Sequence, residues 1–244
     1  MAVVGTRAPS RYGAELASDL AAELSACGVS VVSGLARGID TAAHRGSLSG
    51  CGKAVAVLGS GLDSIYPREN TQLAQAISAR GALITEFAPG TPPEAGNFPR
   101  RNRLIAALSL GVIVIEATER SGAMITARLA GEQGRCVMAT PGAVTNPRSK
   151  GPHRLLRQGA ALVENASDVL NEIAPQLKAC LKPAAASPEP IVALLAGAEL
   201  LPEEIAASLS LDLSLTVTEL TRLEIAGLIE KTAAGRYARR SQDA

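Results

Sequence analysis

Short apolar runs that alternate with helix-like segments constrain the fold of this chain more than any other feature. The runs lie at Ala2–Gly5, Val29–Gly34, Ala54–Gly59, Ala82–Phe87, Val112–Ala117 and Cys136–Thr140. Helical periodicity fills the intervals, at Ala14–Ala26, Asp40–Leu48, Asn70–Arg80, Arg103–Leu108 and Met124–Gln133. Strands that are apolar on both faces and alternate with helices predict a parallel sheet covered by helices on both sides. Ala161–Asn165 predicts a further strand and Asp168–Ile173 a further helix.

The pattern changes near residue 182, where a segment rich in Pro, Ala and Ser begins. We therefore predict three parts: an α/β domain over 1–181, a linker over 182–190 and a small domain over 191–240. The small domain reads as helix, helix, helix and then a segment that can form a hairpin, which is the order of a winged helix.

Several classes of protein do not fit this sequence. No window is as long and apolar as a membrane span, which needs roughly 18 uninterrupted apolar residues, and no secretory signal is visible. The cysteines, Cys27, Cys51, Cys136 and Cys180, form no CxxC pair, which favours reduced thiols in a cytoplasmic protein. The loops match neither a dinucleotide fingerprint nor a nucleotide-binding P-loop.

Polar, glycine-rich loops follow four of the predicted strands. They read GTRAPSRYG, SGLARGID, GSGLDSIYP and ATERSGAMITA. Glycine lets a backbone approach a ligand closely, and free N–H groups at a helix start attract anions. A single such loop is explained by strand-to-helix geometry alone, but several at the carboxyl edge of one sheet indicate an anion site.

Positive charge is concentrated beside these loops. The chain carries a formal charge of only +1, yet ten basic and three acidic residues give +7 between Pro99 and Arg157. The segment after Ala184 carries −4. A positive sheet edge with directed donors suits a polyanion such as a nucleic acid. Phe98, beside the arginines, is either a packing residue or a platform for unpaired bases.

The sequence gives little support for catalysis. Asp40 and His44 lie four residues apart in one predicted helix, a spacing that allows a hydrogen bond or a metal pair. However, the only other histidine is His153, and no carboxylate cluster with metal-ligand spacing accompanies these residues. We expect a binding protein with no catalytic residue, no metal and no cofactor.

Taken together, these motifs resemble one family. VVGTRAPSRYG, VVSGLARGIDTAAHRG, AVLGSGLDSIYPREN, NFPRRNRLIAALS and ERSGAMITARLAGEQGR are similar to DNA-processing protein A (DprA, also called Smf) in order and content. The resemblance implies an extended Rossmann-like domain followed by a winged-helix-like domain. It also implies a cytoplasmic homodimer that binds and protects single-stranded DNA and loads the recombinase RecA onto it during natural transformation.

The resemblance also implies which residues line the DNA pocket. Carried over by position, they are Arg7, Ser33, Gly34, Arg37, Gly38, Arg100, Arg101, Asn102, Arg103, Ser121 and Gly122, with Lys150 in a later loop. The predicted DNA-binding site also includes Gly5 in the first loop and Phe98 beside the arginines. SKGPHR departs from the family pattern, which puts a role for Pro152 and His153 in doubt.

Two alternatives remain open. One is a nucleotide phosphoribohydrolase on a related fold, although the PGGxGTxxE motif of those enzymes is replaced here by SGAMITARLAGE. The other is a sequence-specific duplex binder acting through the winged helix, against which the negative charge of the tail argues.

Overall fold

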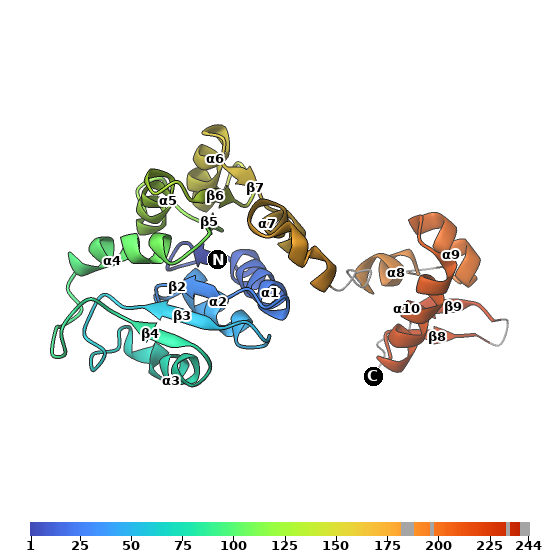
Figure 1. Cartoon of the computed structure of the whole chain (residues 1–244). Coiled ribbons are helices and arrows are strands. Elements are labelled where there is room, and N and C mark those ends of the chain that lie inside the picture. The colour runs from blue at the N-terminus through green and yellow to red at the C-terminus, as the bar shows by residue number, and fades with distance from the viewer. Residues whose placement is uncertain (182–187, 196–197, 233–234, 240–244) are drawn as a thin grey trace. The chain divides into compact units, whose positions relative to one another are not determined.

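The computed structural model of the chain describes residues 1–181, 188–195, 198–232 and 235–239 (Figure 1). The chain divides into two compact units, Met1–Leu181 and Lys182–Ala244. Residues 182–187, which form most of the predicted linker, lie outside the described residues, and Pro188–Pro190 already belong to a helix. No helix within the described ranges is long and apolar enough to cross a membrane.

The first unit contains a seven-stranded sheet in which every neighbouring pair of strands is parallel. This confirms the predicted fold class. The strand order is β4-β3-β2-β1-β5-β6-β7. The strands are β1 (Ala2–Val4), β2 (Val31–Ser33), β3 (Ala54–Val57), β4 (Ala82–Ile84), β5 (Gly111–Val114), β6 (Cys136–Ala139) and β7 (Ala161–Leu162).

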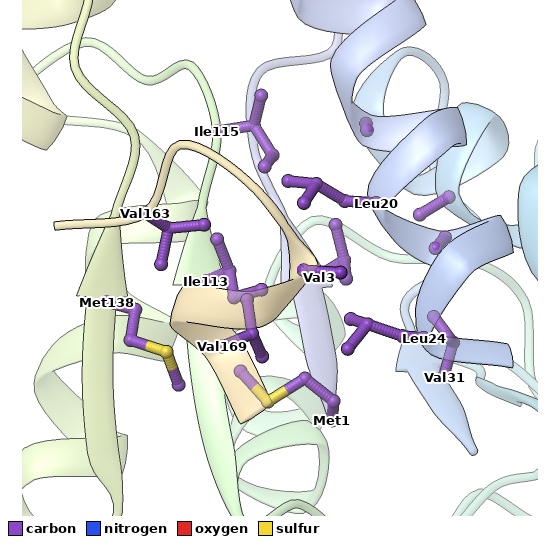
Figure 2. Close-up of a cluster of buried hydrophobic side chains, with 14 of the residues drawn as sticks. Met1, Val3, Leu20, Leu24, Val31, Ile113, Ile115, Met138, Val163 and Val169 are labelled. Carbon is purple, nitrogen blue, oxygen red and sulfur yellow. The ribbon is translucent and has the colours of Figure 1, made fainter. Parts of the chain in front are cut away.

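Helices cover both faces of this sheet, as the two-sided apolar pattern predicts. On one face, Val3, Ile113 and Met138 pack with the leucines of α1 and with α2 and α7 (Figure 2). On the other face, Val4, Val112 and Val114 pack with α4, α5 and α6. The helices are α1 (Arg11–Ala26), α2 (Ile39–Ser47), α3 (Thr71–Arg80), α4 (Asn97–Ala107), α5 (Gly122–Glu132), α6 (Lys150–Arg157) and α7 (Ala166–Ile173), with short 3-10 turns η1 (Arg68–Asn70), η2 (Pro147–Ser149) and η3 (Pro175–Cys180).

Two helices differ from the prediction because proline lies in their first turn. α4 begins at Asn97 rather than Arg103, so Pro99 is its third helical residue. α6 was not predicted, and Pro152 is its third residue. The first N–H groups of a helix have no intrahelical partner, so proline is tolerated there. As a result, the whole cluster of arginines lies on α4 rather than in the loop before it.

The second unit has the predicted order of three helices and a hairpin. Its elements are α8 (Pro188–Leu194), α9 (Pro202–Leu209), α10 (Leu213–Ile225) and the antiparallel strands β8 (Ile229–Lys231) and β9 (Tyr237–Arg239). Ile191, Ile205, Leu220, Leu223 and Tyr237 are among the residues of its core. The unit therefore buries an apolar core of its own.

Candidate nucleic-acid interface

The candidate site lies where the strand order reverses. From β1 the chain adds β2, β3 and β4 on one side, and then crosses to add β5, β6 and β7 on the other. In open parallel sheets, ligands bind outside the carboxyl ends of the strands at such a switch point. The loop that contains Arg7 follows β1, and the loop that leads to Ser121 and Gly122 follows β5, so both predicted segments meet at this point.

Two small hollows bring most of the predicted residues together. One, of about 60 Å³, is lined by Gly5, Arg7, Phe98, Arg101, Asn102 and Gly122, among others. The other, of about 40 Å³, is lined by Arg7, Gly34, Arg37, Phe98 and also Tyr66. Arg7 and Phe98 border both hollows and so define the centre of the candidate site.

An arginine–aromatic stack forms this centre. The guanidinium carbon of Arg7 lies 5.4 Å from the centroid of the Phe98 ring. Tyr66 packs against the same ring with 5.7 Å between centroids. Arg7 is exposed and forms no ion pair with a carboxylate of the described residues. The stack therefore presents a positive charge that the protein itself does not neutralise.

The arginines of α4 have three different environments. Arg100 is exposed, with its guanidinium carbon 5.7 Å from the centroid of the Phe87 ring. Arg103 forms an ion pair with Glu86. Arg101 is buried, with only 4% of its surface exposed. Of the three, Arg100 is the one whose charge is both exposed and free of a carboxylate among the described residues.

Arg101 joins the loop after β2 to the last residue of β3. Its Nη1 donates to the carbonyl oxygens of Gly34, at 2.8 Å, and Val57, and its Nε donates to Asn102 Oδ1 at 3.2 Å. Burial lowers the pKa of Arg101 to about 10, although nearby Asp40 opposes this shift. A side chain at Gly34 would collide with both groups, because its Cβ would lie 2.5 Å from Arg101 and 2.7 Å from Asp40. Glycine is therefore required between the buried cation and the buried acid.

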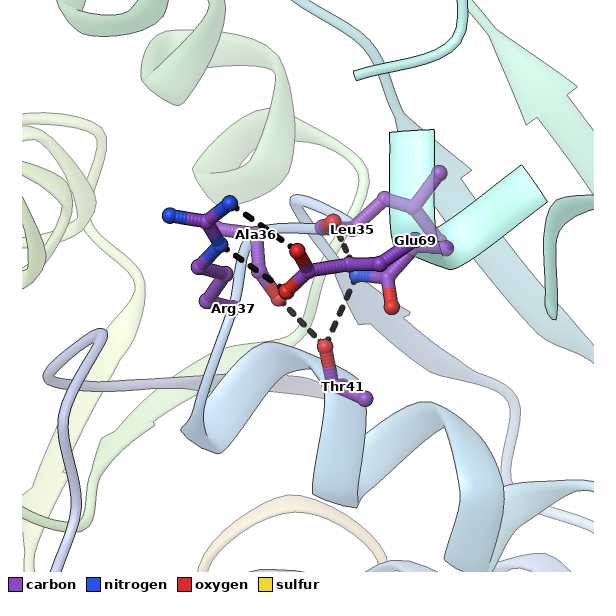
Figure 3. Close-up of polar contacts among 6 residues, drawn as sticks. Leu35, Ala36, Arg37, Thr41 and Glu69 are labelled. Carbon is purple, nitrogen blue, oxygen red and sulfur yellow. Dashed lines mark hydrogen bonds and ion pairs between the residues drawn. The ribbon is translucent and has the colours of Figure 1, made fainter. Parts of the chain in front are cut away.

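The loop after β2 is held in shape by polar contacts. The Arg37 guanidinium donates two hydrogen bonds to Glu69, at 2.8 and 2.9 Å, while Thr41 Oγ1 donates to the Ala36 carbonyl (Figure 3). Gly38 has a φ of 75° and a ψ of −123°, and a Cβ there would lie 2.4 Å from the Thr6 carbonyl oxygen. The charge of Arg37 is therefore paired with that of Glu69. Gly38 allows this loop to contact the Arg7 loop.

The remaining predicted residues divide into buried and exposed positions. Ser33 is fully buried, and its hydroxyl donates to the Val3 carbonyl at 2.7 Å, so its side chain is out of reach of a surface ligand. Asn102 Nδ2 donates to the Gly122 carbonyl at 3.2 Å. Ser121 and Gly122 begin α5, where free N–H groups favour an anion. Lys150 is exposed at the start of α6.

Sequence reasoning missed three residues that the structure brings to this edge. Tyr66 contacts Phe98 although 32 positions separate them. Arg148 Nε donates to the Ala8 carbonyl at 2.6 Å. Glu116, two residues after β5, accepts from the Ser10 N–H and hydroxyl at 2.8 and 2.6 Å, which anchors the Arg7 loop. No motif signals these contacts, because each joins distant segments.

The pair Asp40 and His44 does not form an exposed catalytic site. Both residues are buried. Burial lowers the pKa of His44 to about 3. Burial also raises the pKa of Asp40, which Arg101 opposes. Within the described ranges, no cluster of three His, Cys, Asp or Glu side chains can hold a metal ion.

Comparison with known proteins shows the family to which the chain belongs. A sequence model of the family described as DNA recombination-mediator protein A matches residues 1–174. The chain belongs to this family. It is 49% identical to Protein Smf of Escherichia coli over 71% of this chain and 46% of that protein. It is 43% identical to DNA processing protein DprA of Bacillus subtilis over 70% of this chain and 58% of that protein. The matched region is thus about half the length of these relatives.

Solved structures of the family share the fold of the first unit. DNA processing protein A from Streptococcus pneumoniae has a TM-score of 0.66 at 45% identity, covering 70% of this chain and 60% of that one. A structure of the Helicobacter pylori protein, which concerns its single-stranded DNA binding mode, has a TM-score of 0.65 at 34% identity over 70% and 77% of the chains. Membership of this DNA-processing family does not favour the phosphoribohydrolase alternative.

Proposed function

We propose that this protein binds single-stranded DNA with little sequence preference, through the carboxyl edge of the parallel sheet. The observation that carries the proposal is the exposed Arg7 guanidinium above Phe98 at the switch point, with no carboxylate partner among the described residues. A phosphate can pair with the guanidinium while an unpaired base stacks beside the ring. A duplex keeps its bases stacked inside and cannot use the ring in this way.

The surrounding groups add phosphate contacts without reading sequence. Arg100 supplies a second exposed guanidinium, and the N-terminus of α5 at Gly122 supplies backbone N–H groups. Backbone contacts of this kind fix the position of a strand but carry no sequence information. Arg101, Ser33 and Arg37 support the loops in this proposal, and they do not contact DNA. In this proposal the site binds the DNA strand and catalyses no reaction on it.

The family resemblance and the single-stranded DNA binding of the Helicobacter pylori relative support a wider role. We propose that the protein is cytoplasmic, protects incoming strands during natural transformation, and delivers them to the recombinase RecA. We also propose a homodimer. β7 is the last strand of the sheet, and its residue Leu162 is 49% exposed, so this edge is a candidate surface between subunits.

Fluorescence anisotropy with a labelled oligothymidylate and with a duplex of equal length tests the binding proposal. We expect the single strand to bind more tightly, and its log affinity to fall with log salt at a slope of about −0.7 per phosphate contacted. Arg7→Ala should weaken binding and make this slope shallower. Equal affinity for strand and duplex, or a salt-independent affinity, would refute the proposal.

Arg45→Ala is the matched control. Arg45 is exposed and forms no ion pair with a described carboxylate, but it lies in the last turn of α2. Because α2 runs back from the end of β2, this turn is near the opposite edge of the sheet. The variant removes the same charge from the protein and should leave affinity almost unchanged.

A further inference from the structure

The two phenylalanines of this chain share an unusual setting. The whole chain contains two Phe, three Tyr and no Trp. Each phenylalanine ring has an arginine guanidinium over it, Arg7 over Phe98 and Arg100 over Phe87. Among the described residues, neither phenylalanine belongs to a hydrophobic core cluster or packs against one. A chain short of aromatic residues has therefore placed its phenylalanines near the surface rather than in the core.

Phe87 lies in a segment that is joined to α4. It follows β4, and its N–H donates to the Thr85 hydroxyl at 3.1 Å. The preceding residue, Glu86, forms an ion pair with Arg103 of α4. This pair joins the segment after β4 to the helix that carries Arg100, so the ring and the guanidinium are brought together by two separate elements. The two backbone segments that carry Phe87 and Arg100 are therefore held next to each other.

The chemistry of the pair matches an unpaired nucleotide. A guanidinium held over an aromatic ring has its other face free for a base, and its N–H groups can still reach a phosphate. Arg100 is exposed, and it has no carboxylate partner among the described residues. Packing alone would not require a cation at this point.

This pair is distinct from the stack at Phe98. Phe98 and Arg100 are two residues apart on α4, and residues at that spacing point about 200° apart around a helix. The two positions therefore lie on different sides of the first turns of α4. A single base cannot occupy both, but a strand that crosses the start of the helix can.

We propose that Phe87 and Arg100 form a second base-stacking position, which a single strand occupies together with the stack of Arg7, Phe98 and Tyr66. The proposal rests on the proposed function and extends it. It implies that the strand crosses the N-terminal half of α4, and that oligonucleotides long enough to reach both positions gain affinity over those that fill one.

Variants with oligonucleotides of increasing length test this proposal. Phe87→Leu and Phe98→Leu each remove a ring but keep an apolar side chain, so the fold is retained, which thermal denaturation checks. Single-strand sites span about 4–16 nucleotides, so oligothymidylates of about four and sixteen nucleotides are compared by anisotropy. Stacking one base contributes about 5- to 150-fold in affinity. We expect Phe87→Leu to lower affinity within this range for the long strand and to leave the short strand unaffected.

The outcomes separate this inference from the function on which it rests. Failure of the unmodified protein to bind either strand would overturn the proposed function itself. A second result would overturn only the second position. In it, the unmodified protein binds single strands and Phe98→Leu weakens this binding, but Phe87→Leu leaves the affinity unchanged at every length. Equal loss for short and long strands in Phe87→Leu would also contradict a separate position. Leu108→Ala, which alters a 48% exposed apolar residue at the far end of α4, should bind like the unmodified protein.

Discussion

Replacing Arg101 by alanine should destabilise the first unit, whereas replacing its neighbour Arg100 should not. Arg101 has 4% of its surface exposed and donates to the Gly34 and Val57 carbonyls. Its charge also compensates Asp40, which is 6% exposed and accepts a hydrogen bond from the Gly34 N–H at 3.0 Å. The alanine variant leaves that acid and two carbonyl groups without their cation.

The size of this effect follows from the burial. A hydrogen bond to a charged group contributes about 1.5–3 kcal/mol, so losing the two bonds that Arg101 donates to carbonyl groups costs about 3–6 kcal/mol. The unit spans Met1–Leu181, and for a domain of this length each kcal/mol lowers the melting temperature by about 2–4 °C. Arg101→Ala should therefore lower the melting temperature by about 6–24 °C. Arg100 is exposed, so Arg100→Ala should change the free energy of unfolding by no more than about 0.5 kcal/mol.

The effect of Arg101→Ala on Asp40 can also be measured, through the pH dependence of the melting temperature. Burial raises the pKa of Asp40 and Arg101 opposes that shift, so loss of Arg101 should raise this pKa further. A carboxyl whose pKa is higher in the folded state binds protons on folding, so it favours the folded state as pH falls. The difference in melting temperature between Arg101→Ala and the unmodified protein should therefore narrow at acidic pH.

Scanning calorimetry of the two variants measures both effects. Adding Asp40→Asn to Arg101→Ala should recover part of the lost stability, because the second substitution removes the uncompensated charge. The reasoning is refuted if Arg101→Ala has the same melting temperature as Arg100→Ala but a lower affinity for single strands. That pattern would mean that Arg101 contacts DNA directly.

Three further predictions concern other parts of the molecule. The pKa of His44 is about 3 in the folded protein, against an ordinary value of 6.5. Between these two pH values the unfolded chain therefore binds more protons than the folded chain. Chemical denaturation should then show stability falling toward acidic pH, by up to about 1.4 kcal/mol per pH unit, more steeply than in His44→Leu; parallel pH profiles would contradict this. Gly38→Ala should cost about 1–3 kcal/mol and weaken strand binding, because its φ of 75° and its contact with Thr6 exclude a side chain; unchanged melting and anisotropy curves would show that the loop adapts. Ending the chain after Leu181 should leave single-strand affinity largely intact, since the segment after Ala184 carries −4; a large loss measured by anisotropy would assign binding to the second unit.

The sequence by itself determined the architecture of the first unit. Runs such as Val112–Ala117 are apolar on both faces, so only a sheet covered on both sides can bury them. The glycine-rich loops then had to follow the parallel strands at one edge. The order of elements in the second unit was also readable, because helical periodicity and turn residues are local signals. The start of α4 was misplaced because the prolines of first turns read locally as breaks.

Only the tertiary structure decided what each arginine does. Arg100, Arg101 and Arg103 are almost indistinguishable in sequence, yet one is exposed over a ring, one is buried and one is paired. Their roles depend on which side of α4 each one faces and on the groups that other strands bring there: Phe87, Asp40 and Glu86. Those groups lie between about ten and sixty residues away along the chain. Local sequence carries no information on such contacts, because burial and charge pairing are set by the packing of whole elements against one another.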